Sequence, residues 1–173
     1  MSHCEKIRTD VVICDEIFYF NDLEIDVPLG FDAPADSTLA GTVSVTLAEC
    51  EVTIDEGGSF VLETLFIVQK ELTLTTPTGE EFPLEFMERL VFDATFRKCN
   101  AAVLDLLGLS PEQLSCHVVY TNAFDEITLD TDADTFTEDL TIELKAMVIA
   151  EEQVFMQLCP PQNSVDIPVN LVE

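Results

Sequence analysis

Apolar and polar residues alternate strictly through the middle of the chain, and this pattern constrains the fold more than any other feature. Apolar side chains occupy every second position over 43–47 and again over 50–54. A period of two residues places such side chains on one face of a β-strand. The alternation shifts by one position at Ala48-Glu49, as it does at a β-bulge. The pattern therefore predicts one long strand over 39–54 that bends at a bulge.

A turn and a second long strand follow. Asp55-Glu56-Gly57-Gly58 contains two glycines, which adopt the positive φ of tight turns without a steric penalty. Residues 59–75 are rich in β-branched and aromatic residues, so we expect them to return antiparallel to 39–54. The same kind of pattern predicts further strands over residues 80–98, 116–121, 126–129, 136–150 and 153–158, and an edge strand over 165–172.

One short helix interrupts the strands. Asn100 is predicted to cap a helix over residues 100–108, which Gly108 ends, and Ser110-Pro111 is typical of a second helical turn. Many strands with one small helix favour an all-β fold, an antiparallel β-sandwich or jelly roll. The polar residues 1–10 are predicted to form an N-terminal arm, and residues 11–173 a single β-sandwich domain.

The chain is strongly acidic along its whole length. It has 34 acidic residues against 7 basic ones, a net charge of −27. Such a surface disfavours nucleic acid and anionic membranes as partners, because binding phosphate requires Lys and Arg. No apolar stretch approaches the roughly 20 residues that span a bilayer. A halophilic cytosolic protein would also be acidic, but 12 Phe and 6 Cys fit that alternative less well.

No catalytic constellation is visible in the sequence. The histidines are His3, in the expected arm, and His117, next to Cys116. Neighbouring residues of a strand point to opposite faces, so Cys116 and His117 cannot form a thiol–imidazole pair. There is no glycine-rich phosphate loop. The sequence therefore predicts a protein that is not an enzyme, with no catalytic residues and no cofactor.

One acidic turn partly matches a calcium loop. Asp130, Asp132 and Asp134 stand at alternate positions, as the first ligands of such a loop do. Thr135 replaces the turn glycine and Thr141 the bidentate glutamate. We therefore expect a solvated turn without metal, and weak calcium binding by the three aspartates is the alternative. Without a C-x-x-C motif, structural zinc is disfavoured.

The cysteines suggest a disulfide framework. An even number of widely spaced cysteines is typical of disulfide-bonded proteins, but the first ten residues resemble no secretory signal. We therefore expect synthesis in the cytoplasm and cross-linking later, after the cell opens or dies. The alternative is a set of buried free thiols. The candidates are Cys4, Cys14, Cys50, Cys99, Cys116 and Cys159.

Position suggests some of the pairings. Cys99 and Cys116 flank the expected helix and could bridge to each other. Cys4 lies on a polar arm without a core to bury it, so it is the favoured site of an intermolecular disulfide. Cys14 and Cys159, near the two ends of the folded region, are plausible partners on a neighbouring subunit or on the same one.

Some of these segments resemble bacterial spore-envelope proteins. Residues 59–75 followed by 79–96, and later 139–158, are similar to the strands of the SPOCS-type spore coat domain. A cysteine-bearing arm before a β-sandwich resembles the endospore appendage subunit, a jelly roll whose N-terminal arm bonds to preceding subunits. The resemblance implies a structural protein, finally located on a spore or cell surface, whose partners are copies of itself and other spore-surface proteins.

The sequence thus favours a non-enzymatic subunit that self-assembles into a disulfide-linked surface layer or filament. Assembly would use an exposed sheet edge that accepts a strand or arm from the next subunit. Two alternatives stay open. One is a calcium-dependent β-sandwich binding module, and the other is a small cytosolic regulatory domain with free thiols.

Overall fold

Long antiparallel strands make up most of the computed structural model, which describes residues 5–156 and the side chains of residues 9–151. This confirms the predicted all-β class with one short helix. The elements are β1 (Glu5–Pro28), β2 (Thr38–Ile54), β3 (Ser59–Thr75), β4 (Glu81–Asn100), α1 (Ala102–Leu107), the 3₁₀ turn η1 (Pro111–Gln113), β5 (Leu114–Asp130) and β6 (Thr135–Met156). No helix among the described residues is long and apolar enough to cross a membrane.

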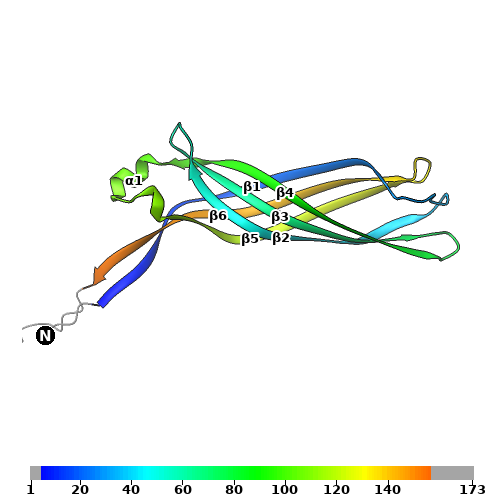
Figure 1. Ribbon diagram of the computed structural model, residues 1–173, viewed down its shortest axis with the longest axis horizontal. Helices are drawn as coiled ribbons and strands as arrows, with labels where there is room; N and C mark the ends of the chain where they lie inside the picture. The colour runs from blue at the N-terminus through cyan, green and yellow to red at the C-terminus, as the bar shows by residue number, and fades with distance from the viewer. Residues whose placement is uncertain (1–4, 157–173) are drawn as a thin grey trace, which may run out of the picture.

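The strands form two three-stranded sheets that pack face to face along the long axis of the molecule (Figure 1). One sheet has the order β1-β6-β5 and the other β2-β3-β4. On one side of the sandwich β2 lies beside β5, and on the other β1 lies beside β4. Each side of the sandwich therefore brings together an edge strand from each sheet.

The predicted hairpin over residues 39–54 and 59–75 is confirmed. β2 pairs antiparallel with β3 from Thr38↔Thr75 to Ile54↔Phe60. The register shifts between Leu47 and Glu49, where the alternation predicted a bulge. The bulge keeps the apolar residues on both sides of it facing the same core.

Other strand boundaries differ from the predictions. The two short strands over 116–121 and 126–129 are one continuous strand, β5. The expected hairpin between 136–150 and 153–158 is absent from the described residues, because β6 runs straight through to Met156. Residues 157–173, including the predicted edge strand over 165–172, lie outside the described residues.

The strand β1 was not predicted. Its inward positions include Cys14, Phe18 and Phe20, which are buried, but also the carboxylates of Glu16 and Glu24. These acids break the apolar alternation that would have indicated a strand. Residues 5–10, expected as an arm, form the beginning of β1 and pair with the end of β6, from Glu5↔Met156 to Asp10↔Glu151.

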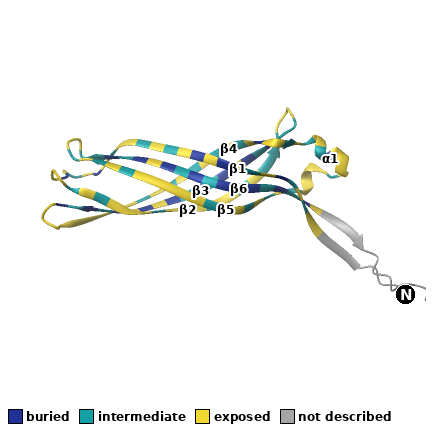
Figure 2. Ribbon diagram, turned by 180° about the vertical axis from the view of Figure 1, so that it is seen from behind, coloured by how far each residue is buried: buried dark blue, intermediate teal, exposed yellow. Residues whose placement is uncertain are grey.

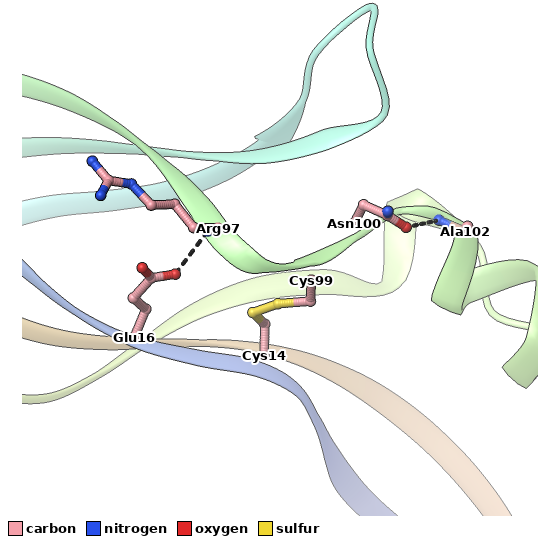
Figure 3. Close-up of a disulfide and its surroundings, with 6 residues drawn as sticks. All are labelled: Cys14, Glu16, Arg97, Cys99, Asn100 and Ala102. Carbon is pink, nitrogen blue, oxygen red and sulfur yellow. Dashed lines mark hydrogen bonds between the residues drawn. A yellow bond between two sulfur atoms is a disulfide. The ribbon is translucent and has the colours of Figure 1, made fainter.

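The helix lies where it was predicted, with a different N-cap. The N-cap residue is Ala101 and not Asn100, although the Asn100 Oδ1 accepts a hydrogen bond from the Ala102 N–H at 3.1 Å (Figure 3). Gly108 ends the helix in the left-handed conformation (φ 66°), as predicted. Ser110 caps η1 by accepting a hydrogen bond from the Glu112 N–H.

The core lies between the middle strands of the two sheets, β3 and β6, whose inward side chains are buried (Figure 2). It consists of two apolar clusters. The larger one includes Phe66, Val68 and Leu140, and the smaller one, toward the end opposite α1, includes Leu72 and Phe136. On β3 and on β6 a charged residue stands between the two clusters.

The backbones of β2 and β3 approach each other closely at Gly41. A Cβ atom at Gly41 would collide with the Glu71 carbonyl oxygen and lie 2.7 Å from the Leu72 Cα. Gly41→Ala should therefore lower the free energy of unfolding by about 1–3 kcal/mol, measured by urea denaturation. Gly57→Ala is the control, since its Cβ would meet only the flexible Asp55 side chain, at 3.3 Å. Equal stability of the two variants would contradict the prediction.

Candidate functional site

Two disulfides connect the sheets. Cys14 on β1 bonds to Cys99 on β4, with 6.1 Å between their Cα atoms (Figure 3). Cys50 on β2 bonds to Cys116 on β5, with 5.8 Å between their Cα atoms. Because β1 and β4 form one side of the sandwich and β2 and β5 the other, each side carries one inter-sheet disulfide.

These pairings correct the sequence-based ones. The bridge expected between Cys99 and Cys116 does not form, because the two cysteines lie on opposite sides of the sandwich. The alternative of six free thiols is also wrong, since four cysteines are paired. Cys14 is bonded within its own chain, which removes it as a partner for Cys4. Cys4 and Cys159 lie outside the described residues, so the intermolecular link at Cys4 stays a prediction.

Both disulfides close long loops. The bonded residues are 85 and 66 positions apart. In the chain-entropy model, loops of this size correspond to about 4–5 kcal/mol of stabilisation each. The two loops overlap in sequence, so the second disulfide restricts a chain that the first has already shortened. Their joint contribution is therefore smaller than the sum.

A hydrogen bond joins β1 and β4 next to the first disulfide. The Arg97 main-chain N–H, on β4, donates to the Glu16 Oε2, on β1, at 2.8 Å (Figure 3). Both strands are at the edges of their sheets, where backbone groups lack a strand partner. The Glu16 carboxylate therefore satisfies one donor that an open sheet edge would otherwise present.

A buried lysine lies at the boundary of the two apolar clusters. Lys70 on β3 is 2% exposed, and its ammonium group contacts three carboxylates from three other strands. Its Nζ lies 2.8 Å from the Glu24 Oε2 and 2.6 Å from the Glu88 Oε1, and it forms a third ion pair with Glu138. We call Lys70, Glu24, Glu88 and Glu138 the Lys70 cluster. It connects β1, β3, β4 and β6.

Burial and ion pairing act in opposite directions on this cluster. Burial lowers the pKa of Lys70, but the neighbouring carboxylates, Glu138 foremost, raise it by more, so Lys70 stays charged. Burial raises the pKa of Glu138 to about 7, against the lowering effect of Lys70. Asp125 on β5 adds to this rise. The pKa of Asp125 is itself raised, mainly by burial.

The sequence contained a signal for this cluster. Lys70 and Glu138 occupy the same parity as the buried apolar residues of their strands, so each interrupts an inward-facing row. A charge at such a position requires a partner. Sequence reasoning missed the cluster because the partners come from strands distant in sequence.

The side of the sandwich between β1 and β4 is hollowed. A hollow of about 520 Å³, which we call the β1–β4 hollow, is lined by residues 16–20 of β1 and by Asp93, Ala94, Thr95 and Arg97 of β4. Phe18 and Phe20, both buried, are among the residues that line it. A second hollow of about 340 Å³ opens beside the Lys70 cluster. The two edge strands thus leave space between them on this side.

The acidic turn is organised by its own carboxylates. The Asp130 Oδ1 accepts hydrogen bonds from the N–H groups of Asp132 (2.9 Å) and Ala133 (3.2 Å). The Asp134 Oδ1 accepts one from the Ala33 N–H at 2.6 Å. Asp130 and Asp132 are exposed, as predicted, but Asp134 is half-buried because it fastens the β1–β2 loop. Whether the turn binds calcium stays a prediction.

A different carboxylate group converges more closely. Oxygen atoms of Asp22, Glu24 and Glu88 lie within 4.8 Å of one another. Sequence reasoning did not identify this group. The Lys70 ammonium already pairs with two of its three members, so this group is held together by a cation from the protein itself.

The pair Cys116–His117 is separated as expected for neighbouring strand residues. Cys116 faces inward and is bonded to Cys50, whereas His117 is exposed. A disulfide-bonded sulfur is not a thiolate nucleophile. His3 lies outside the described residues.

Comparison of the chain with protein-family models, with curated proteins and with solved structures finds no match. The fold and the cysteines define the class of protein by themselves. It is an antiparallel β-sandwich whose two sheets are joined by a disulfide on each side.

The Lys70 cluster predicts a pH dependence of stability. Glu138 has a pKa of about 7 in the folded state and an ordinary value of 4.5, so between these values the folded protein binds the extra proton. The free energy of unfolding should therefore fall as pH rises from 5 to 7, by roughly 1 kcal/mol per pH unit.

Loss of surface charge repulsion at low pH acts in the same direction, so a variant must isolate Glu138. Glu138→Gln should make the slope of unfolding free energy against pH smaller, in denaturation series at pH 5, 6 and 7. Glu126→Gln removes a carboxylate from an exposed position and should leave the slope as in the wild type. An unchanged slope in Glu138→Gln would contradict the account.

The inter-sheet disulfides predict a large loss of stability on removal. Cys14→Ala with Cys99→Ala should lower the free energy of unfolding by about 2–5 kcal/mol, measured in guanidinium chloride without reductant. The pair Cys50→Ala and Cys116→Ala is the matched variant and should lose a similar amount. Reductant should destabilise the wild type by more than either pair of substitutions. A wild-type unfolding midpoint that reductant does not move would contradict this.

Proposed function

We propose that the protein is a non-enzymatic structural subunit that self-assembles into a disulfide-linked layer or filament on a spore surface. The two inter-sheet disulfides support a durable structural role, because each fastens one sheet to the other. They use four of the six cysteines, which leaves Cys4 and Cys159 for links between subunits. The observation that carries the proposal is that the beginning of β1 and the end of β6, which are close in sequence to Cys4 and Cys159, pair with each other.

The beginning of β1 and the end of β6 leave the sandwich together, at the end that carries α1 (Figure 1). Residues 5–10 pair with residues 151–156, and we call this pair of segments the terminal ribbon. The pairing of β5 with β6 begins only at Leu114↔Ala150, so within the described residues the ribbon has two strands. An isolated two-stranded ribbon is marginally stable in water. A neighbouring subunit that adds a strand to it would stabilise it.

The chain keeps both remaining cysteines near the end of the ribbon. Glu5 and Met156 are register partners. Cys4 directly precedes Glu5, and Cys159 follows Met156 by three residues. An extended chain spans at most about 3.6 Å per residue, so Cys159 stays within about 11 Å of Met156. A subunit that engages the ribbon therefore meets these thiols at high effective concentration.

The charge of the protein suits covalent assembly. A net charge of −27 makes protomers repel one another, which suppresses non-specific contacts. A disulfide then holds a specific contact that electrostatic repulsion would otherwise weaken. Synthesis in the reducing cytoplasm and oxidation at the spore surface would separate folding from cross-linking in time. The partners are copies of the same chain, and other spore-surface proteins could join them.

Electrophoresis without reductant tests the proposal. Oxidised wild-type protein should form a ladder of covalent multimers that reductant collapses to one band. Cys4→Ser should remove most of the ladder, and Cys4→Ser with Cys159→Ser should remove all of it. The double variant still carries both inter-sheet disulfides, so it is the control for folding, checked by its melting temperature.

Two outcomes would change the account. A full ladder in Cys4→Ser would contradict the link at Cys4 and move it to Cys159. Wild-type protein that stays monomeric after oxidation would contradict covalent assembly. A disulfide between Cys4 and Cys159 of the same chain, in place of links between chains, would contradict it equally.

A further inference from the structure

The β1–β4 hollow has the features of a site for an added strand. β1 pairs with β6 and β4 with β3, so among the described strands each has one edge without a strand partner. The hollow between these edges is about 520 Å³ in volume. At one end lie the Cys14–Cys99 disulfide and the bond from Arg97 to Glu16, and at the other lies the Lys70 cluster.

Phe18 and Phe20 line the hollow beside polar residues, and their rings pack into the core. Phe18 packs edge to face on Phe96, with ring centroids 5.0 Å apart, and Phe20 stacks on Phe92 at 4.9 Å. Backbone edges that lack a strand partner, apart from the bonded Arg97 N–H, and the apolar side chains of Phe18 and Phe20 suit an extended peptide with apolar side chains at alternate positions. Beyond Phe20, toward Glu24, the charges of the Lys70 cluster oppose strand addition to the edge of β1. Inward-pointing charges protect a sheet edge in this way.

We propose that the β1–β4 hollow receives residues 165–171 of a second copy of the chain, as a strand added to the edge of β1. This inference rests on the proposed function and names a second contact surface, besides the terminal ribbon, through which subunits assemble. The segment Val165-Asp166-Ile167-Pro168-Val169-Asn170-Leu171 is apolar at every second position. Its length, about 20 Å as a strand, covers the edge from Glu16 to Phe20, about 13 Å.

Charge and proline placement fit this occupant. Residues 157–173 contain two acidic residues, Asp166 and Glu173, so the segment approaches an acidic body with little repulsion. Pro168 lacks an N–H but stands on the polar parity of the segment, and proline is tolerated in an edge strand. The apolar side chains would face Phe18 and Phe20, and the polar ones the solvent.

The short linker between Met156 and Val165 favours docking of the segment from a second copy over docking within the same chain. Met156 pairs with Glu5, which is eleven residues from Glu16 along β1, or about 36 Å. The nine residues from Met156 to Val165 span at most about 32 Å when fully extended. Following the path of β1, the segment of the same chain would therefore stop short of Glu16, which favours a second copy. A second copy approaching with its terminal ribbon has no such limit.

Sedimentation velocity of the Cys4→Ser, Cys159→Ser protein tests the docking without covalent links, in 0.5 M salt to screen repulsion. This protein should associate as its concentration rises. Adding Ile167→Asp should weaken association at least about tenfold, because it would bury an unpaired charge. Asn170→Asp adds the same charge at the opposite parity and should leave association within about twofold. These substitutions lie outside the described sandwich, and unchanged melting temperatures would show that folding is intact.

A photo-crosslinking residue in place of Thr95, at the wall of the hollow, locates the occupant. In a mixture of isotope-labelled and unlabelled protein, crosslinks should join position 95 to residues 165–171 of a different chain. Crosslinks within one chain only, or equal weakening by Ile167→Asp and Asn170→Asp, would overturn the inference. A Cys4-dependent ladder that persists in Ile167→Asp would overturn this docking site and leave the proposed function standing. Absence of the ladder in oxidised wild-type protein would overturn the proposed function.

Discussion

The packing of β3 against β6 is the contact on which the rest of the structure depends. Each sheet has three strands and one face to bury, so neither sheet is stable without the other. The inward side chains of both central strands are fully buried, among them Phe66, Leu72, Ile142 and Leu144. The edge strands on the two sides of the sandwich meet less completely, and specific inter-sheet links supplement the packing both there and at the boundary of the two apolar clusters.

Those links are of two kinds. The disulfides at Cys14–Cys99 and Cys50–Cys116 fasten the two sides covalently toward the end that carries α1. The Lys70 cluster joins four strands electrostatically at the boundary of the two apolar clusters. A buried ion pair is weak evidence for added stability, because desolvation offsets much of the Coulomb energy. The Lys70 cluster is better suited to fixing the register of the strands, because one ammonium group contacts carboxylates from strands of both sheets.

Local features of the structure could be predicted from the sequence. The hairpin of β2 and β3, its bulge after Leu47 and the end of α1 at Gly108 depend on neighbouring residues only, so periodicity and turn chemistry were sufficient. The strand β1 was missed because acids at inward positions, such as Glu16, obscure its alternation.

The candidate site could not be predicted in the same way. Disulfide partners depend on which edges of the two sheets become neighbours, and the sequence does not encode this locally. Proximity in sequence favoured a bridge from Cys99 to Cys116, whereas the topology places them on opposite sides. The Lys70 cluster was missed for the same reason, because its carboxylates come from β1, β4 and β6.

The central claim is that four cysteines hold the two sheets of one subunit together and the other two join subunits. Mass spectrometry of unreduced peptides, from multimers assembled from isotope-labelled and unlabelled protein, tests it most directly. The account predicts Cys14–Cys99 and Cys50–Cys116 peptides of a single label, and mixed-label peptides that contain Cys4. A Cys99–Cys116 peptide, or mixed-label peptides confined to the four inter-sheet cysteines, would contradict it.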